Sequence, residues 1–282
     1  MRARAPASAA NLGPGFDALA LALSLYVEVE VRPAPALRVS ASGEGADLPR
    51  DARHLAVRVA SAVAGTDALE ISVASEIPVG RGLGSSAALA VAAAAAAGAP
   101  DPLVWGARVD GHPENAAAST LGGLVAAAEI GGGPVARRLA LDPDLRAVLV
   151  VPDRPLPTAE ARAALPATVP HADAGFNLGR LALLVAGLAD AGALVAEAGD
   201  DRLHQDARSR LFPEAPGLLA GLREAGALTS CWSGAGPSLM GLARSAAAED
   251  LGKVAAGLLE RSGVPGRVLV LAPDTAGVVV EP

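Results

Sequence analysis

The sequence predicts an α+β fold in two domains, and three observations lead to this prediction. Residues 26–31, Tyr-Val-Glu-Val-Glu-Val, alternate apolar and charged side chains, which is typical of a strand with one solvated face. Residues 52–64 carry apolar side chains at helical spacing. Five prolines crowd residues 152–170, where long helices cannot persist. We therefore expect an N-terminal domain at 1–152 and a C-terminal domain at 153–282, sizes that are ordinary for single domains.

The remaining elements are predicted from the same periodicities. The apolar run 18–25 leads directly into the first strand, and residues 69–75 repeat its alternation. The alanine-rich run 87–99 is too short to cross a bilayer, so we expect a buried helix that begins near Ser85. Further strands are expected at 121–128, 146–151, 227–232, 239–243 and 267–272, and further helices at 173–191, 217–225 and 246–261.

Composition and charge exclude several functions. The 30 acidic and 23 basic residues give a net charge of -7, so there is no basic field to hold nucleic acid. A single cysteine, Cys231, excludes a disulfide framework and a cysteine-based zinc site, which favours a reducing compartment. Loop-forming residues separate the N-terminal arginines from the apolar run 18–25, so that run is interpreted as a strand rather than a signal peptide. We expect cytoplasmic localisation, with neither nucleic acid nor membrane as a partner.

The segment 78–88, Pro-Val-Gly-Arg-Gly-Leu-Gly-Ser-Ser-Ala-Ala, follows a predicted strand and opens into a predicted helix. Glycines let backbone amides approach an anion, and the first turn of a helix favours negative charge. One interpretation is a phosphate-binding loop, and the other is a tight turn with Ser85 as a helix N-cap. A Walker loop is excluded because the only lysine is Lys253. No acid-ending second strand completes a Rossmann unit, and G-x-S-x-G is absent.

Two more glycine-rich segments, 6–17 and 233–238, complete a three-loop pattern that resembles the GHMP small-molecule kinases. Within that superfamily the chain is most similar to the homoserine kinase family, over nearly its whole length. The matching segments are 6–17 (P-A-[ST]-x-A-N-L-G-x-G-F-D), 78–87 (P-x-x-x-G-L-G-S-S-A), 111–115 with 121–123 (G-H-x-D-N and L-G-G), and then 158–162, 203–208 and 233–238 in the family's order.

The resemblance implies the two-domain GHMP kinase fold, with an N-terminal domain like domain 2 of ribosomal protein S5 and a ferredoxin-like C-terminal domain. It also implies a phosphotransferase that uses ATP and Mg2+ to convert L-homoserine into O-phospho-L-homoserine for threonine synthesis. A homodimer is one assembly compatible with this reading. Two alternatives stay open: another GHMP kinase acting on an isoprenoid acid or a sugar, and a noncatalytic GHMP-fold sensor of a nucleotide or metabolite.

Site residues are also implied by the resemblance. The arginines in the substrate set bind the carboxylate, while Asn11 and Asp17 hold the hydroxyl and amino groups in an undivided assignment. The ATP-binding set is Pro78, Gly80, Arg81, Gly82, Leu83, Gly84, Ser85, Ser86 and Ala87, with His54 on the adenine side. The substrate-binding set is Asn11, Asp17, His112, Thr158, Arg162 and Arg208; the catalytic set is Asn11, Asp110 and Asn115; the metal set is Ser85, Ser86 and Asp110.

Three positions qualify these assignments. Asn115 stands where other GHMP kinases are expected to place an aspartate, and an amide accepts no proton at neutral pH. Because phosphoryl transfer depends mainly on positioning and charge neutralisation, we expect Asn11 and Asn115 to orient a hydroxyl that loses its proton late, to phosphate oxygen or water. Asp110 replaces the family's glutamate, so direct and water-bridged metal contacts both stay open. His54 replaces the family's asparagine and alternatively is a buried helix residue.

Taken alone, the remaining charged candidates have simpler explanations. Each arginine of the substrate set fits a solvated surface charge in a chain rich in arginine. His112 fits a helix cap or a buried polar group with satisfied hydrogen bonds. The two arginines therefore decide the prediction, because they mark an amino-acid site only if distant parts of the chain bring them together.

Overall fold

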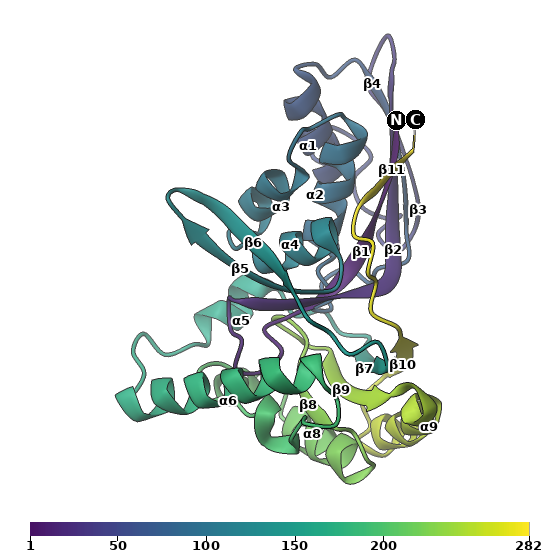
Figure 1. The fold of residues 1–282 in the computed structure, drawn as a ribbon. Helices are drawn as coiled ribbons and strands as arrows, with labels where there is room; N and C mark the ends of the chain where they lie inside the picture. Colours follow the sequence, from purple (N-terminus) through teal and green to yellow (C-terminus); the bar gives the residue numbers. More distant parts are fainter. Residues whose placement is uncertain (282) are drawn as a thin grey trace.

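Two β-sheets organise residues 1–281, which a computed structural model describes (Figure 1). The larger sheet has the order β11-β1-β2-β4-β3, and β5 and β6 extend it from β2. Its pairs are antiparallel except for β3 with β4. The strands are β1 (Arg2–Ala10), β2 (Leu19–Pro33), β3 (Arg38–Gly43), β4 (Leu69–Ser75), β5 (Leu124–Ile130), β6 (Gly133–Leu139) and β11 (Val279–Glu281).

Helices α1 (Leu55–Ala64), α2 (Ser85–Ala96), α3 (Pro102–Asp110) and α4 (Glu114–Leu121) lie on one side of this sheet (Figure 1). Helices α2 and α4 pack directly on β1 and β2. Most alanines of α2 and of β1 are almost fully buried where these two elements pack together, and such small side chains permit a close approach of helix and strand. This small-residue packing fixes the start of α2 beside the end of β1.

The smaller sheet is antiparallel, in the order β10-β7-β9-β8, and α8 and α9 cover one of its faces. Its βαββαβ connectivity is the ferredoxin-like arrangement that the family resemblance implied. Four further helices lie between β7 and β8. The elements are β7 (Leu145–Pro152), α5 (Thr158–Ala163), α6 (His171–Ala189), η1 (Ala196–Gly199), α7 (Gln205–Ser209), α8 (Ala215–Glu224), β8 (Thr229–Trp232), β9 (Leu239–Arg244), α9 (Ser245–Arg261) and β10 (Gly266–Leu271).

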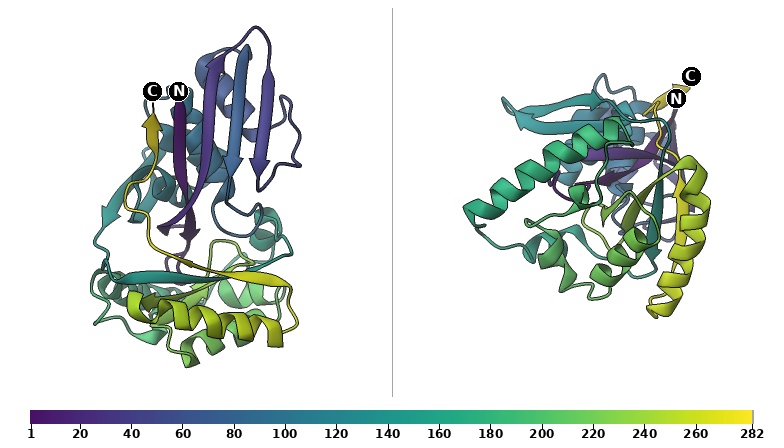
Figure 2. Two further views of the ribbon diagram at one scale, coloured as in Figure 1. Left: turned by 90° about the vertical axis from the view of Figure 1, so that its right-hand side faces the viewer. Right: turned by 60° about the horizontal axis from the view of Figure 1, so that its bottom comes forward.

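The sheets divide the chain differently from the predicted boundary between residues 152 and 153. β7 precedes the proline-rich segment, yet it is a central strand of the smaller sheet. β11 returns to the larger sheet beside β1, so the two termini lie next to each other (Figure 2). The prolines therefore mark the connection after β7 and not the change of sheet.

Most of the predicted elements are present, and two segments differ. The alternation at 69–75 coincides with β4, and the alanine-rich run forms the buried helix α2. Residues 6–10, placed in a loop by their resemblance to a glycine-rich motif, are the end of β1, because they pair with β2 and pack under α2. Leu121 ends α4 rather than starting a strand, and β5 begins at Leu124.

One apolar core joins the two sheets. It runs from β1, β2 and α2 to buried side chains of the smaller sheet, among them Leu145, Leu149 and Met240. A second cluster fills the space between the smaller sheet and helices α8 and α9. Because the first core is continuous, the loops between the sheets have fixed positions relative to one another.

Helix α6 is 19 residues long with a mean hydropathy of 1.2, and within residues 1–281 it alone meets the length and composition of a membrane span. Helices of water-soluble proteins also meet that requirement. Here α6 packs against η1, and the buried Asn177 donates from Nδ2 to Asp201 Oδ1 at 2.7 Å.

Candidate active site

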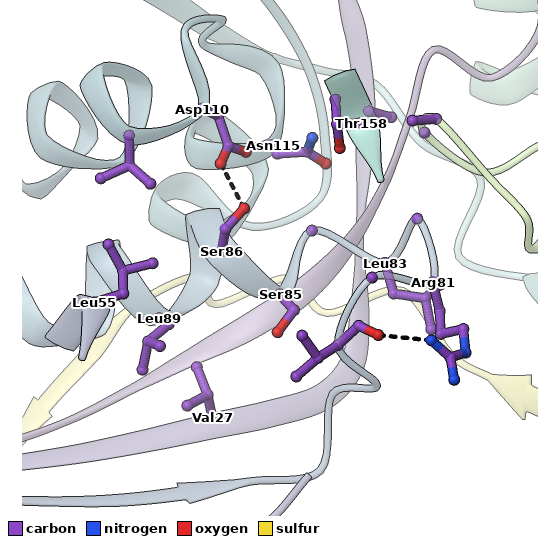
Figure 3. A pocket seen from close by; sticks show the side chains of 18 of the residues that line it. Val27, Leu55, Arg81, Leu83, Ser85, Ser86, Leu89, Asp110, Asn115 and Thr158 are labelled. Atoms are coloured by element: carbon purple, nitrogen blue, oxygen red, sulfur yellow. Dashed lines mark hydrogen bonds between the residues drawn. The ribbon is translucent and has the colours of Figure 1, made fainter. Parts of the chain in front are cut away.

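A cavity of about 420 Å3 brings the predicted site residues together (Figure 3). Only Pro78 and Ala87 of the predicted set stay outside its lining, because both side chains are buried behind the loop. The predicted residues that line it are Asn11, Asp17, His54, Gly80, Arg81, Gly82, Leu83, Gly84, Ser85, Ser86, Asp110, His112, Asn115, Thr158, Arg162 and Arg208.

The loop before α2 has a backbone shape that favours glycine at three positions. Gly80, Gly82 and Gly84 have φ of 69°, 73° and 65°, in the left-handed region. A Cβ on Gly82 would lie 2.3 Å from the carbonyl oxygen of Ser233. The Ser233 hydroxyl in turn donates to Gly82 O at 2.7 Å. The third glycine-rich segment, 233–238, connects two strands of the smaller sheet and holds this loop in place.

The first turn of α2 offers free backbone donors to the cavity. Gly84 is the N-cap and makes no side-chain cap, so Ser85 is the first helical residue and not the capping residue of the alternative interpretation. The N–H groups of Ser85, Ser86 and Ala87 donate to no acceptor within residues 1–281. Together with the glycine loop, these donors and the helix dipole form a cradle for an anion.

Ser86 and Asp110 form a pair of hard oxygen donors at the polar end of the cavity. The Ser86 hydroxyl donates to Asp110 Oδ1 at 2.5 Å, while Ser85 lies apart from this pair (Figure 3). Burial raises the pKa of Asp110, and the hydrogen bond from Ser86 opposes that rise. Within the described part of the chain, no cluster of three or more His, Cys, Asp or Glu side chains could hold a metal ion.

Arg162 also lines the cavity, where it forms a two-pronged ion pair with Asp17. Its Nη2 and Nη1 donate to the two carboxylate oxygens at 2.6 and 3.1 Å. The hydrogen bond to Asp17 raises the pKa of Arg162 against the opposing effect of burial. The guanidinium carbons of Arg162 and Arg208 lie 5.7 and 5.5 Å from the centroid of the Phe16 ring. The two arginines therefore converge on one aromatic ring.

Arg208 is a buried cation, 1% exposed, that pairs with no carboxylate among the described residues. Its Nη1 donates to Gly234 O at 2.9 Å and to Nδ1 of His204 at 2.9 Å. Burial, and after it the charge of Arg162, lowers the pKa of Arg208 to about 10. The guanidinium group is still charged at neutral pH, so it can bind an anion that enters the cavity beside Arg208.

The Asn11 side chain is engaged at both ends of its amide. Its Oδ1 accepts from the backbone N of Asp17 at 3.0 Å, and its Nδ2 donates to Gly234 O at 2.9 Å. Both Asn11 and Asp17 have left-handed backbones, with φ of 70° and 53°. Such strain is kept where surrounding contacts fix it. One N–H and one lone pair of the amide remain for a ligand.

Two buried polar residues, Ser8 and Glu114, contact residues of the cavity wall, although sequence reasoning gave them no role. The Ser8 hydroxyl, fully buried, donates to Oδ1 of Asn115 at 2.9 Å. Glu114, 1% exposed, places Oε1 2.6 Å from Nδ1 of His112. Burial is the largest single effect on the pKa of His112 and lowers it, but the close contact with Glu114 and the charges of Glu114 and Asp110 together raise the pKa above its ordinary value. Ser8 lies in the matched segment 6–17 and Glu114 in the matched segment 111–115, and this position was the only sign in the sequence that they belong near the site.

One part of the cavity lining is apolar, and His54 lies in this part. His54 is the N-cap of α1, where Nδ1 accepts from Ala56 N at 3.2 Å, and burial lowers its pKa. His54 is therefore a buried residue at the start of α1 whose ring also lines the cavity, which is compatible with both interpretations. Val27, Leu55 and Leu89 gather beyond Ser85 in Figure 3. Sequence reasoning missed these three because they look like ordinary core residues.

Comparisons with known proteins identify the family of this chain. Residues 53–123 match the family model of the GHMP kinase N-terminal domain, and residues 182–257 match that of the GHMP kinase C-terminal domain. The chain is 39% identical to the homoserine kinase of Moorella thermoacetica, over 98% of each chain. It is 42% identical to that of Streptomyces avermitilis, over 90% of this chain and 89% of the relative. The crystal structure of homoserine kinase from Cytophaga hutchinsonii superposes with a TM-score of 0.86 at 27% identity, over 100% of this chain and 97% of that one.

Proposed function

Because the chain belongs to the homoserine kinase family of the GHMP kinases, we propose that it transfers the γ-phosphoryl group of ATP to the side-chain hydroxyl of L-homoserine. The product is O-phospho-L-homoserine, and we propose threonine biosynthesis as the pathway and the cytoplasm as the compartment. The reaction needs one site for a triphosphate and one for a small zwitterion with a primary hydroxyl.

The observation that carries this proposal is the meeting of Arg162, Arg208 and Asp17 in the cavity that the glycine loop also lines. Two guanidinium groups match a carboxylate, and one carboxylate matches an ammonium group. In the free protein Arg162 and Asp17 satisfy each other. The carboxylate of an amino acid can replace Asp17 as the partner of Arg162, and its ammonium group can replace Arg162 as the partner of Asp17. An isoprenoid acid offers only the carboxylate, and a sugar offers neither group.

The nucleotide fits the glycine loop and the apolar part of the cavity. The free N–H groups at the start of α2 and the loop Gly80–Gly84 suit the phosphates. The apolar side chains around Leu55 and Leu89 suit a purine ring, with His54 at their edge. Its Nδ1 is occupied by the cap of α1, so in this proposal only Nε2 of His54 remains to contact the base.

The residues present fit a magnesium ion carried in with the nucleotide. Mg2+ prefers hard oxygen ligands and usually binds through one or two carboxylates together with substrate phosphates. The 2.5 Å Ser86–Asp110 pair next to the phosphate cradle supplies such oxygens, and Ser85 is a less favourable ligand because it lies apart from Asp110. When bound, the ion would neutralise charge on the phosphates. We propose Ser86 and Asp110 as its protein ligands.

Asn115 and Asn11 are proposed to orient the hydroxyl group that attacks phosphorus. The hydrogen bond from Ser8 to Oδ1 of Asn115 leaves the amide NH2 of Asn115 free to donate into the cavity. Asn115 therefore acts as a donor to oxygen rather than as a base. This is compatible with a loose transition state in which the proton leaves late, to phosphate oxygen or water.

The test is an ADP-release assay with Mg-ATP and each of three acceptors: L-homoserine, mevalonate and galactose. We expect turnover with homoserine alone and phosphohomoserine as the product by mass spectrometry. Turnover of mevalonate or galactose without turnover of homoserine would assign the chain to another GHMP activity. Binding of homoserine with Mg-ATP present, but no phosphohomoserine, would make the chain a sensor.

Further proposals concern partners. With a pI of about 5.2 and a net charge of -7, the chain has no excess of basic residues for nucleic acid, so we propose none. We likewise propose no membrane partner. A homodimer is proposed as one possible assembly, to be checked by sedimentation of the purified protein.

A further inference from the structure

His204 is a buried side chain beside the substrate cations, and the reaction as proposed above assigns it no role. It lies just before α7 and is 1% exposed. Its ring stacks on Phe16 with centroids 5.1 Å apart. Nδ1 lies 2.9 Å from Nη1 of Arg208, and Nε2 lies 2.9 Å from the carbonyl oxygen of Gly13. The ring thus connects the cation of α7 to the loop that carries Asp17.

The two contacts permit one protonation state. A carbonyl oxygen only accepts, so Nε2 must carry the proton that it donates to Gly13. A guanidinium only donates, so Nδ1 of His204 must be unprotonated to accept from Arg208. The neutral Nε2–H tautomer satisfies both. The charged neighbours are Arg208, Asp17 and Asp201, whose Oδ2 lies 3.7 Å from Nε2, and burial lowers the pKa of His204 to about 4.

The bond to His204 matters because Arg208 has few other restraints. Both of its hydrogen bonds within the described chain use Nη1, and its buried Nε has no partner. With Nη1 held between His204 and Gly234, the planar guanidinium can present its remaining N–H groups in one direction. Without the imidazole acceptor, Arg208 keeps only the hydrogen bond to Gly234 O to orient its guanidinium.

We propose that His204 is a positioning residue that, as a neutral Nδ1 acceptor, aims Arg208 at the carboxylate of the amino-acid substrate. This inference rests on the proposed function, in which Arg208 binds that carboxylate. The same ring fixes Gly13, four residues before Asp17, so one side chain sets the spacing between the anion-binding and cation-binding halves of the substrate site.

Two substitutions separate the contacts. In His204→Asn the amide Oδ1 takes the place of Nδ1 and can still accept from Arg208. In His204→Gln the amide reaches towards Gly13 and a methylene group stands where the acceptor was. We expect His204→Gln to raise the KM for homoserine about tenfold or more, since a hydrogen bond to a charged group is lost, with the KM for ATP unchanged. His204→Asn should recover a large part of that loss. His171→Gln, at the exposed start of α6, is the matched control.

A double-mutant cycle with Arg208→Leu links the effect to the cation. We expect His204→Gln to add little to the KM of the Arg208→Leu variant. Equal KM values for the Asn and Gln variants, a parallel rise in the KM for ATP, or multiplicative effects in the cycle would overturn the inference. If Arg208→Leu itself leaves the homoserine KM unchanged, the carboxylate assignment of the proposed function fails instead.

A measurement on the unaltered protein covers the case in which the variants do not fold. Ring 15N chemical shifts of His204 should show a protonated Nε2 and an unprotonated Nδ1 throughout pH 6 to 9. An Nδ1–H tautomer, or an imidazolium at pH 6, would contradict the proposed acceptor role.

Discussion

The replacement of Arg162 by alanine tests the amino-acid site most directly. In the free protein this residue is tied to Asp17 by two hydrogen bonds, yet the two side chains are 37% and 36% exposed. An ion pair that exposed contributes about 0.2–1 kcal/mol to stability. We therefore expect Arg162→Ala to lower the free energy of unfolding by less than about 1 kcal/mol.

The effect on substrate binding should be larger. A hydrogen bond to a charged partner is worth about 1.5–3 kcal/mol. If Arg162 moves from Asp17 to the substrate carboxylate on binding, its loss removes that contact. At about 1.4 kcal/mol per factor of ten, the KM for homoserine should rise roughly 10- to 100-fold. The kcat should change little, because the contact is present in ground and transition states alike.

The assay is coupled ADP release, with homoserine and ATP varied separately. The matched control is Arg244→Ala, which removes a 3.2 Å ion pair to Asp144 with side chains 44% and 39% exposed, outside the cavity lining. The control should leave both KM values unchanged. An Arg162→Ala enzyme with an unaltered homoserine KM, or with ATP and homoserine KM rising together, would remove this arginine from the substrate site.

Three further predictions concern the phosphate loop, the metal and acid stability. Gly82→Ala should abolish ATP binding by calorimetry, because its Cβ would meet Ser233 O at 2.3 Å, whereas Gly217→Ala, with open space around it, should bind normally. Ser86→Ala should raise the Mg2+ concentration needed for half-maximal activity; an unchanged Mg2+ dependence would exclude Ser86 as a ligand. Burial lowers the pKa of His204 to about 4, so between pH 6.5 and 4 this side chain is protonated in the unfolded chain but not in the folded one. The free energy of unfolding should therefore fall by on the order of 3 kcal/mol as the pH is lowered through this range. Urea unfolding should show this decline flattened in His204→Asn, and an equal slope in both proteins would contradict it.

Strands and helices with strong periodicity could be predicted from the sequence, and those without it could not. The alternation at 69–75 predicts β4 because one face of that strand is solvated. β1 offers no such signal, since its alanines are buried beneath α2 and its polar Ser8 is also buried, with its hydroxyl bonded to Asn115. The third strand, β3, does alternate polar and apolar side chains, but it has only six residues, lies at the edge of the sheet and only partly buries Val39 and Ala41, so its signal is short and weak.

The site shows the same division between local and tertiary information. The glycine loop and the two arginines could be predicted because motif chemistry is local and survives in the sequence. The partners of those residues could not, because each contact joins segments that are far apart. Ser8 meets Asn115 across 107 positions, and Asn11 meets Gly234 across 223. The first contact depends on how α4 packs on β1, and the second on how the parts of the chain around the two sheets pack together; no periodicity of the sequence records either.

Three hydrogen bonds join the parts of the chain around the two sheets, and they bear on the proposed reaction, to which no strong base is assigned. Asn11 to Gly234, Ser233 to Gly82 and His204 to Gly13 each join a loop of the larger sheet to a segment of the smaller unit. At about 1 kcal/mol each, they disfavour separation by on the order of 3 kcal/mol, roughly a factor of 100. The cradle and the cations are therefore already aligned before substrates arrive. Since positioning supplies most of the acceleration in phosphoryl transfer, this alignment is the protein's main contribution to the proposed reaction.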